Sequence, residues 1–281
     1  MTGNISAKNT KLGRLIHAWS VTAGESCPGE TQLCAARCYA KRGHFHQTTT
    51  KRSHANNLAF SKLDAFVPWM KAKILADGVN VLRVHVAGDF YDLDYIAKWY
   101  DICHHHRRVK FFAYTRSWRI EALFPGLVQL GALPNFSMWW SIDRATGMAP
   151  AVRGIRQAYM AINDADAEAA PADCDLVFRD QRPNTKRTVM KKASGVLVCP
   201  PENGVHTKTK ITCSRCGICW NTGTPAWESI LGDYLLTEDA ELTAPEVTNV
   251  EFPSTQGRPF LNTASATCDG GFPETYTIAI K

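Results

Sequence analysis

Short apolar runs alternate along the chain with longer segments of helical periodicity. We predict strands at six apolar runs: 14–21, 81–88, 110–116, 135–143, 174–180 and 195–200. Helices are predicted between them, at 56–76, 93–105, 118–130 and 151–162. Strands that alternate with helices are typical of parallel βαβ units. The pattern therefore predicts an α/β fold, a six-stranded parallel partial (β/α)6 barrel whose functional residues follow the carboxyl ends of the strands.

The alternation stops near Thr207, where a cysteine-rich and turn-rich segment begins. We predict that residues 1–200 form the partial barrel and carry a first cysteine group. Residues 201–281 are predicted to form a C-terminal appendage, which completes a second cysteine site together with Cys199. No flexible linker precedes this appendage, so we expect it to pack on the barrel.

Composition places the chain among ordinary globular proteins. It has 281 residues, of which 45% are hydrophobic and 21% charged. The formal charge of +6 is mild, so it leaves nucleic acid open as a partner without requiring it. The N-terminus has no signal-peptide core and no apolar run reaches 18 residues, which predicts a cytoplasmic protein. Thiols stay reduced there, so the ten cysteines are expected to be metal ligands or buried side chains.

The first cysteine group, Cys27, Cys34 and Cys38, lies in the loop after the first predicted strand. Its spacing is C-x6-C-x3-C. Three thiolates can hold three irons of a [4Fe–4S] cubane and leave the fourth iron open to a ligand, and they also suit a [3Fe–4S] form. A zinc site completed by His44 or His46 is one alternative, and three buried cysteines without a metal are the other.

The second cysteine group is Cys213, Cys216 and Cys219, with Cys199 at the end of the last predicted strand. The C-x2-C-x2-C run with a remote Cys-Pro is similar to the binding pattern of bacterial ferredoxins, although the remote cysteine lies upstream here. Four ligands leave no open iron, which suits electron transfer or structural support. A zinc knuckle built from the same four cysteines is the alternative.

The first cysteine loop ends in Cys38-Tyr39-Ala40. A three-cysteine loop after the first strand of a six-stranded partial barrel resembles the radical S-adenosylmethionine superfamily. More narrowly, the chain resembles a phage-borne family with this Cys-Tyr-Ala ending, a later Gly-Asp-Phe and a terminal C-x2-C-x2-C. The resemblance covers about residues 14–220. The superfamily usually has C-x3-C-x2-C and often an aromatic residue before the last cysteine, where this chain has Arg37.

The resemblance implies that Gly88 and Asp89, after the second strand, hold the cofactor. The superfamily has a turn there that accepts hydrogen bonds from the methionine amino group. Glycine lets the backbone approach a ligand closely, and a carboxylate suits an ammonium. An ordinary strand-to-helix turn with an N-cap aspartate is the alternative.

Four further residues are implied as cofactor ligands by the same resemblance. Tyr39 would contact the adenine, and Arg116 or Arg144 would hold the carboxylate. Ser141 and Asp143 lie two residues apart and share a strand face, where they would hold the ribose. Solvated polar residues at strand ends are the alternative.

The resemblance implies a redox enzyme that reductively cleaves S-adenosylmethionine at the first cluster. The second cluster would supply electrons or bind substrate, and a reductase or ferredoxin would be the donor. One alternative is an iron–sulfur protein that transfers electrons or senses redox state without this cofactor. The other is a zinc-stabilised nucleic-acid-binding protein. A phage-borne protein would act in the host cytoplasm. The sequence identifies neither the substrate nor a catalytic side chain.

Overall fold

The computed structural model describes residues 2–7, 9–180, 190–202 and 211–221. All of them belong to the first of the two units into which the chain divides, residues 1–243. Within the described part, no helix is long and apolar enough to cross a membrane.

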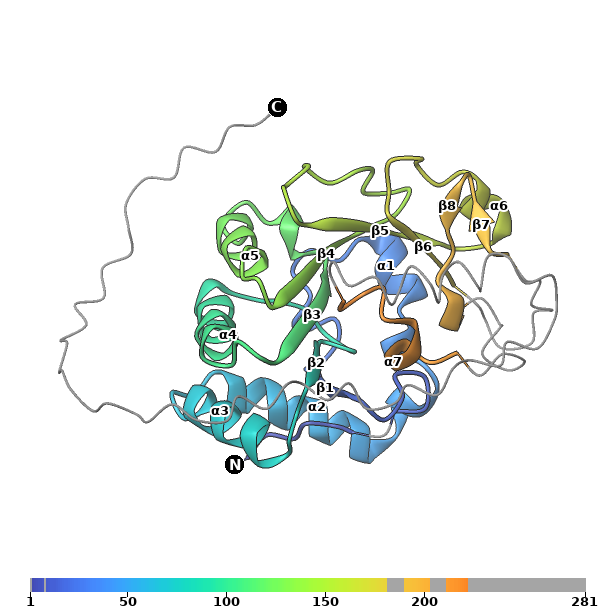
Figure 1. Ribbon diagram of the computed structural model, residues 1–281. Coiled ribbons are helices and arrows are strands. Elements are labelled where there is room, and N and C mark those ends of the chain that lie inside the picture. Colours follow the sequence, from blue (N-terminus) through green and yellow to red (C-terminus); the bar gives the residue numbers. More distant parts are fainter. Residues whose placement is uncertain (1, 8, 181–189, 203–210, 222–281) are drawn as a thin grey trace. The chain divides into compact units, whose positions relative to one another are not determined.

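A six-stranded parallel sheet is the centre of this unit (Figure 1). Its strands are β1 (Ile16–Trp19), β2 (Val81–Val84), β3 (Lys110–Thr115), β4 (Phe136–Ile142), β5 (Arg156–Ala161) and β6 (Leu176–Arg179). Their spatial order is the order along the chain, and every neighbouring pair is parallel. The sheet curls into a half-barrel, so the predicted α/β class with six parallel strands is confirmed.

Helices cover the convex face of the sheet (Figure 1). The longer ones are α2 (Thr48–Ser61), α3 (Phe66–Ala76), α4 (Leu93–His105) and α5 (Phe124–Gly131). Short helical turns complete the described elements: α1 (Gln32–Arg37), η1 (Tyr39–Lys41), η2 (Gly43–His46), η3 (Ser117–Arg119), α6 (Asp164–Glu168), η4 (Pro200–Glu202) and α7 (Cys213–Cys216). The bounds of α4 are those predicted, because Asp92 caps its first turn by accepting the Tyr95 amide at 2.7 Å.

Two predicted elements were wrong. The predicted helix 151–162 contains β5, whose residues Gln157, Ala158 and Tyr159 are all buried. Its side chains are compatible with a helix, but the place between β4 and β6 in the sheet overrides that weak preference. The predicted sixth strand 195–200 contains only β8 (Val196–Leu197), which pairs antiparallel with β7 (Lys192–Ala193). The sixth strand of the sheet is the one predicted as the fifth.

The predicted helix 56–76 is two helices, and α2 begins before the predicted start. Pro68 is the third residue of α3, where its missing amide costs nothing because the first turn of a helix has no internal acceptor for it. Deeper inside a continuous helix the same proline would remove a hydrogen bond. A new helix therefore begins at Phe66. The predicted helix 118–130 is similarly divided into η3 and α5.

The convex side of the sheet is closed by a cluster of aromatic side chains. Trp19 of β1 packs against Phe66 and Trp99, with ring centroids 5.3 and 6.4 Å away. The Tyr95 hydroxyl accepts a hydrogen bond from the Trp19 indole at 2.9 Å and is 2.9 Å from Nε2 of His85. These contacts fix α3 and α4 against the ends of β1 and β2.

The concave side of the half-barrel holds the second cysteine group. Leu12, Ile16, Ala18, Val81 and Phe112 form one apolar cluster there, against which the side chains of Cys213, Cys219 and Trp220 pack. Residues 211–221 therefore lie inside the curl of the sheet. The rest of the predicted appendage, 203–210 and 222–281, is outside the described residues, and the boundary at residue 200 stays a prediction.

His85→Asn should weaken the acid sensitivity of the fold. Burial, with the charge of Arg83, lowers the pKa of His85 to about 3. Below the ordinary pKa of histidine, His85 therefore binds a proton in the unfolded protein but not in the folded protein. The free energy of unfolding should fall by about 1.4 kcal/mol for each pH unit below roughly 6.5 from this group. Asparagine tolerates the positive φ of 68° at this position.

The measurement is urea unfolding of the wild-type and variant proteins at several pH values from about 7 to about 4, a range that includes the ordinary pKa of histidine. The difference between the two free energies should shift in favour of the variant as the pH falls. A difference that does not change with pH would contradict a buried neutral His85.

Candidate functional site

The three-cysteine loop is packed directly on the carboxyl ends of β2 and β3. A Cβ added at Gly29 would lie 2.0 Å from the carbonyl oxygen of Arg116, so only glycine allows this approach of two backbones. Gly88 has φ +85°, and a Cβ there would lie 2.4 Å from Val21 and 2.6 Å from the Ser26 hydroxyl. The loop that carries Cys27 is thus held at the mouth of the half-barrel.

The thiols of the first group lie in one electrostatic neighbourhood. Burial raises the pKa of Cys27 to about 12, and the nearby charges of Asp89, Glu30 and Cys34 raise it further. Burial also raises the pKa of Cys34; Arg116 opposes this effect and Cys38 adds to it. The structure therefore places Cys27 and Cys34 near Asp89, with Cys38 near Cys34. Among the described residues, no three His, Cys, Asp or Glu side chains lie close enough to share one metal ion.

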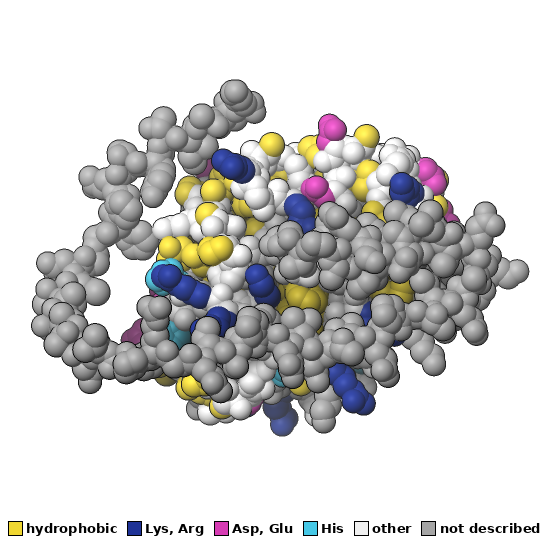
Figure 2. Space-filling view, viewed as in Figure 1, with side chains coloured by type: hydrophobic (Ala, Val, Ile, Leu, Met, Phe, Trp, Pro, Cys, Tyr) yellow, Lys and Arg dark blue, Asp and Glu magenta, His cyan; other side chains and the backbone are white. Residues whose placement is uncertain are grey.

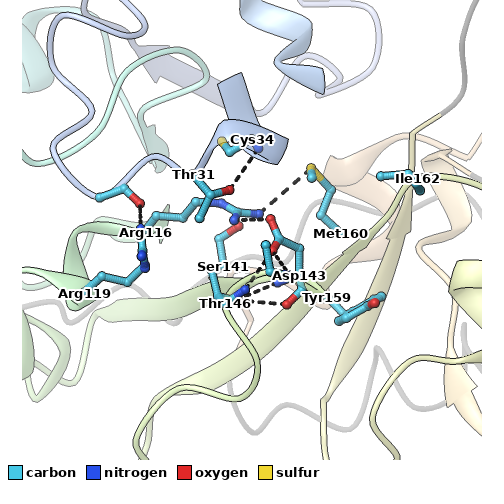
Figure 3. Close-up of polar contacts among 12 residues, drawn as sticks. Thr31, Cys34, Arg116, Arg119, Ser141, Asp143, Thr146, Tyr159, Met160 and Ile162 are labelled. Atoms are coloured by element: carbon cyan, nitrogen blue, oxygen red, sulfur yellow. Dashed lines mark hydrogen bonds and ion pairs between the residues drawn. The ribbon is translucent and has the colours of Figure 1, made fainter. Parts of the chain in front are cut away.

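A buried ion pair stands at the same mouth (Figure 3). Nη1 of Arg116 donates to Oδ2 of Asp143, and both side chains are almost fully buried. Oδ1 of Asp143 accepts the amides of Ala145 and Thr146 at 2.7 and 3.0 Å. Within the described residues, Nη2 of Arg116 has one contact, to the sulfur of Met160 at 4.0 Å. The ends of β3 and β4 are thereby tied together. In Figure 3, Cys34 of α1 lies above this pair.

Asp89 connects the ends of β2 and β3. Its Oδ1 accepts the amide of Phe90 at 2.7 Å and its Oδ2 accepts the amide of Arg116 at 2.8 Å. Burial raises the pKa of Asp89 to about 6, although the Thr115 side chain and the two backbone amides favour the charged form. Asp89 therefore braces two strand ends in addition to facing the cysteines.

Tyr39 and Ser141 lie nearby in different roles. Tyr39 is exposed, and its hydroxyl donates a hydrogen bond to the carbonyl of Val86. The same hydroxyl accepts a hydrogen bond from Arg83 at 3.3 Å. The carbonyl of Ser141 accepts the indole N–H of Trp118 at 3.1 Å. The Ser141 hydroxyl makes no hydrogen bond within the described residues, and the predicted ribose contact stays a prediction.

The second cysteine group is assembled from three parts of the chain. The backbone amide of Cys199 donates a hydrogen bond to the carbonyl of Val177 in β6 at 2.8 Å. The Cys199 side chain belongs to the same apolar cluster as that of Cys216. Trp139 of β4 donates its indole N–H to the carbonyl of Cys219 at 2.9 Å. Burial raises the pKa of Cys219 to about 11, and Cys213 adds to the rise. The four predicted ligands therefore gather in the concave interior.

Two arginines beside this group were not predicted. Arg83 belongs to β2 and Arg156 to β5, and both side chains reach into the interior. A charged residue within the apolar run VLRVHV could have been noticed, because a buried strand rarely carries one without a partner. Arg156 was hidden by the wrong helix prediction.

Gly88→Ala should destabilise the protein more than Gly154→Ala. Both glycines have almost the same left-handed backbone, with φ of +85° and +82°. Only Gly88 has neighbours that a Cβ would strike, whereas Gly154 faces open space. The extra loss should be about 1–3 kcal/mol, measured by urea unfolding. Equal losses would mean that the cysteine loop does not need this close approach.

The chain is similar to known phage proteins over most of its length. It matches the family described as Gene product 88 over residues 2–222, a range that includes both cysteine groups. The Gene 88 protein of Mycobacterium phage D29 is 26% identical over 218 residues, which cover 70% of this chain and 79% of that protein. No solved structure matches. Since the family match spans well over half of the sequence, the chain belongs to the Gene product 88 family.

Proposed function

We propose that this phage protein is an iron–sulfur enzyme of the radical S-adenosylmethionine type. Cys27, Cys34 and Cys38 would hold a [4Fe–4S] cluster with one open iron. When bound, that cluster supplies the electron that cleaves a carbon–sulfur bond of S-adenosylmethionine. A second cluster would be held by Cys199, Cys213, Cys216 and Cys219.

The observation that carries this proposal is the position of the three-cysteine loop. The loop follows β1 of a parallel half-barrel and is fixed on the ends of β2 and β3 by Gly29 and Gly88. Active sites of parallel barrels lie at this end. Each cysteine of a cubane binds a different iron, so three such cysteines do not need to share one ion.

The residues at the mouth have remaining capacity for an amino acid ligand. Each oxygen of Asp89 accepts one backbone amide, and the Thr115 and Ser117 side chains also lie beside the carboxylate. A carboxylate has about four acceptor sites, so an ammonium can still be an additional donor. Nη2 of Arg116 makes no hydrogen bond to oxygen among the described residues, so it can donate to a carboxylate. The Arg116–Asp143 pair keeps this guanidinium in place.

An electron-transfer or redox-sensing iron–sulfur protein is the second candidate. The identity of Arg37 favours this second candidate, because the superfamily often has an aromatic residue near the adenine at this position. Its guanidinium lies 3.5 Å from Asp180, which also binds Arg42 at 3.2 Å. This side chain is therefore engaged with the end of β6 rather than presenting a flat apolar face.

A zinc-stabilised nucleic-acid-binding protein is the third candidate. Lys and Arg side chains recur across the face shown in Figure 2, where Asp and Glu side chains are fewer. This distribution agrees with the mild positive charge and suits a polyanion. Closely overlapping C-x2-C pairs fit a tetrahedral zinc ion less well than two separate pairs, which favours iron at the second group.

Cys34→Ala should remove about one cluster's worth of iron, since the remaining thiolates cannot retain a cubane with three cysteine ligands. Cys103→Ala is the matched control, because Cys103 is fully buried and belongs to neither group. The measurement is iron and sulfide content after anaerobic purification. Wild-type iron content in the Cys34 variant would exclude the first cluster.

Asp89→Asn should weaken binding of S-adenosylmethionine without changing iron content. A hydrogen bond between charged groups contributes roughly 1.5–3 kcal/mol, which is about tenfold or more in affinity. Calorimetric titration of the loaded protein measures this, with Asp94→Asn as control because Asp94 is exposed at the start of α4.

The same proteins should be tested for 5′-deoxyadenosine after reduction with dithionite. Loaded wild-type protein that neither binds nor cleaves the cofactor would contradict the enzymatic proposal and favour the electron-transfer candidate. Protein that holds zinc and no iron under anaerobic handling would favour the third.

A further inference from the structure

Two arginines in the concave interior lack a carboxylate partner. Arg83 and Arg156 form no ion pair within the described residues, whereas Arg116 at the mouth is neutralised by Asp143. Both side chains are half-buried, and the charge of Asp175 acts on Arg156 from beyond ion-pair distance. Taking a guanidinium partly out of water has a cost that a nearby anion offsets. The interior of the half-barrel is therefore arranged to receive negative charge.

Arg156 contacts the backbone of the second cysteine group, and Arg83 lies near enough for its cysteines to act on it. Nη1 of Arg156 donates to the carbonyl of Ile218 at 2.9 Å and Nη2 to that of Cys219 at 3.5 Å. Its guanidinium lies 3.8 Å from the centre of the Trp139 ring, which fixes its plane. Arg83 stands 5.4 Å from the ring of Tyr114, and the charges of Cys213 and Cys219 act on it.

Tyr114 adds an uncommitted donor to the same place. Its hydroxyl oxygen is buried and has no hydrogen-bond partner among the described residues. The hydroxyl lies beside the side chain of Cys219 but outside hydrogen-bond geometry, and Cys199 is also close enough to affect it. A buried hydroxyl without a partner costs about 1–3 kcal/mol. A sulfur atom at the second cysteine group would accept this hydrogen bond.

We propose that Arg83, Arg156 and Tyr114 compensate the negative charge of a four-thiolate iron–sulfur cluster on the second cysteine group and favour its reduced form. This inference rests on the proposed function. Four thiolates outweigh the positive charge of the cluster core, and reduction by one electron adds one further negative charge. Nearby cations and an O–H donor stabilise the reduced form more than the oxidised form, so they raise the reduction potential.

The redox step is a one-electron reduction in which no covalent bond forms or breaks. The electron comes from an external low-potential donor, either a reduced ferredoxin or, in the test, dithionite. Arg83 also donates to the Tyr39 hydroxyl, and Tyr39 follows Cys38 directly. The same guanidinium therefore contacts a residue of the first cysteine loop and lies within the electrostatic reach of Cys213 and Cys219.

The experiment is a potentiometric titration of the second cluster, monitored by electron paramagnetic resonance. It is performed on full-length protein that carries Cys34→Ala, so that one cluster remains. Tyr114→Phe and Arg83→Gln should each lower the ratio of reduced to oxidised cluster at a fixed potential by about tenfold, since each removes a hydrogen bond or charge near sulfur. Iron content should be unchanged.

Arg83→Lys is the matched control for charge and should stay close to the parent protein. Arg107→Gln removes an equal charge from an exposed position, where solvent screens it, and should have no effect. If Arg83→Gln fails to fold or load, Tyr114→Phe still decides, because it removes only an oxygen.

Unchanged potentials in iron-loaded Tyr114→Phe and Arg83→Gln proteins would overturn this inference and leave the proposed clusters intact. Zinc at the second cysteine group, found by elemental analysis, would overturn the second cluster and this inference together. The two failures are therefore distinguishable from the metal content alone.

Discussion

The close contact between the cysteine loop and the strand ends is the constraint on which the rest of the mouth depends. Gly29 meets the backbone of Arg116 with no room for a Cβ, and Gly88 meets Val21 and Ser26 in the same way. Parallel pairing of β1, β2 and β3 places these segments at one edge. The cysteines, Asp89 and the Arg116–Asp143 pair are brought together by backbone packing, which side chains then reinforce.

The electrostatics of the mouth and the interior differ. At the mouth, Arg116 has a carboxylate partner and Asp89 has two backbone donors, so the charges are largely satisfied within the chain. In the interior, Arg83 and Arg156 contact carbonyl oxygens, aromatic rings and the Tyr39 hydroxyl, and neither forms an ion pair within the described residues. A protein interior tolerates such cations when an anion lies close. This difference supports assigning a permanent anionic centre to the interior and an exchangeable ligand to the mouth.

Alternation of apolar runs and helical segments was enough to predict the fold class, because it follows directly from burial of the strands on both faces. It failed where local preference and tertiary position disagree. Residues 156–161 lack the β-branched side chains that indicate a strand, yet they complete the sheet. The cysteine spacings predicted two groups in sequence, but the route of residues 211–221 back into the half-barrel depends on long-range contacts that no local pattern contains. Arg156 and its place beside Cys219 could not be found for that reason.

The second cysteine group also depends on the N-terminal segment. Cys213 donates its amide to the carbonyl of Lys11 at 2.9 Å, and Ser214 donates to that of Leu12 at 2.9 Å. Gly13, at φ +85°, leaves no space for a Cβ beside Ser214. These contacts join segments about 200 residues apart in sequence, so their closure has an entropic cost that the packed sheet between them offsets. A metal bound at the second cysteine group would therefore stabilise the closure of these distant segments as well as its own ligands, because binding energy at a site that folding assembles is part of the folding energy.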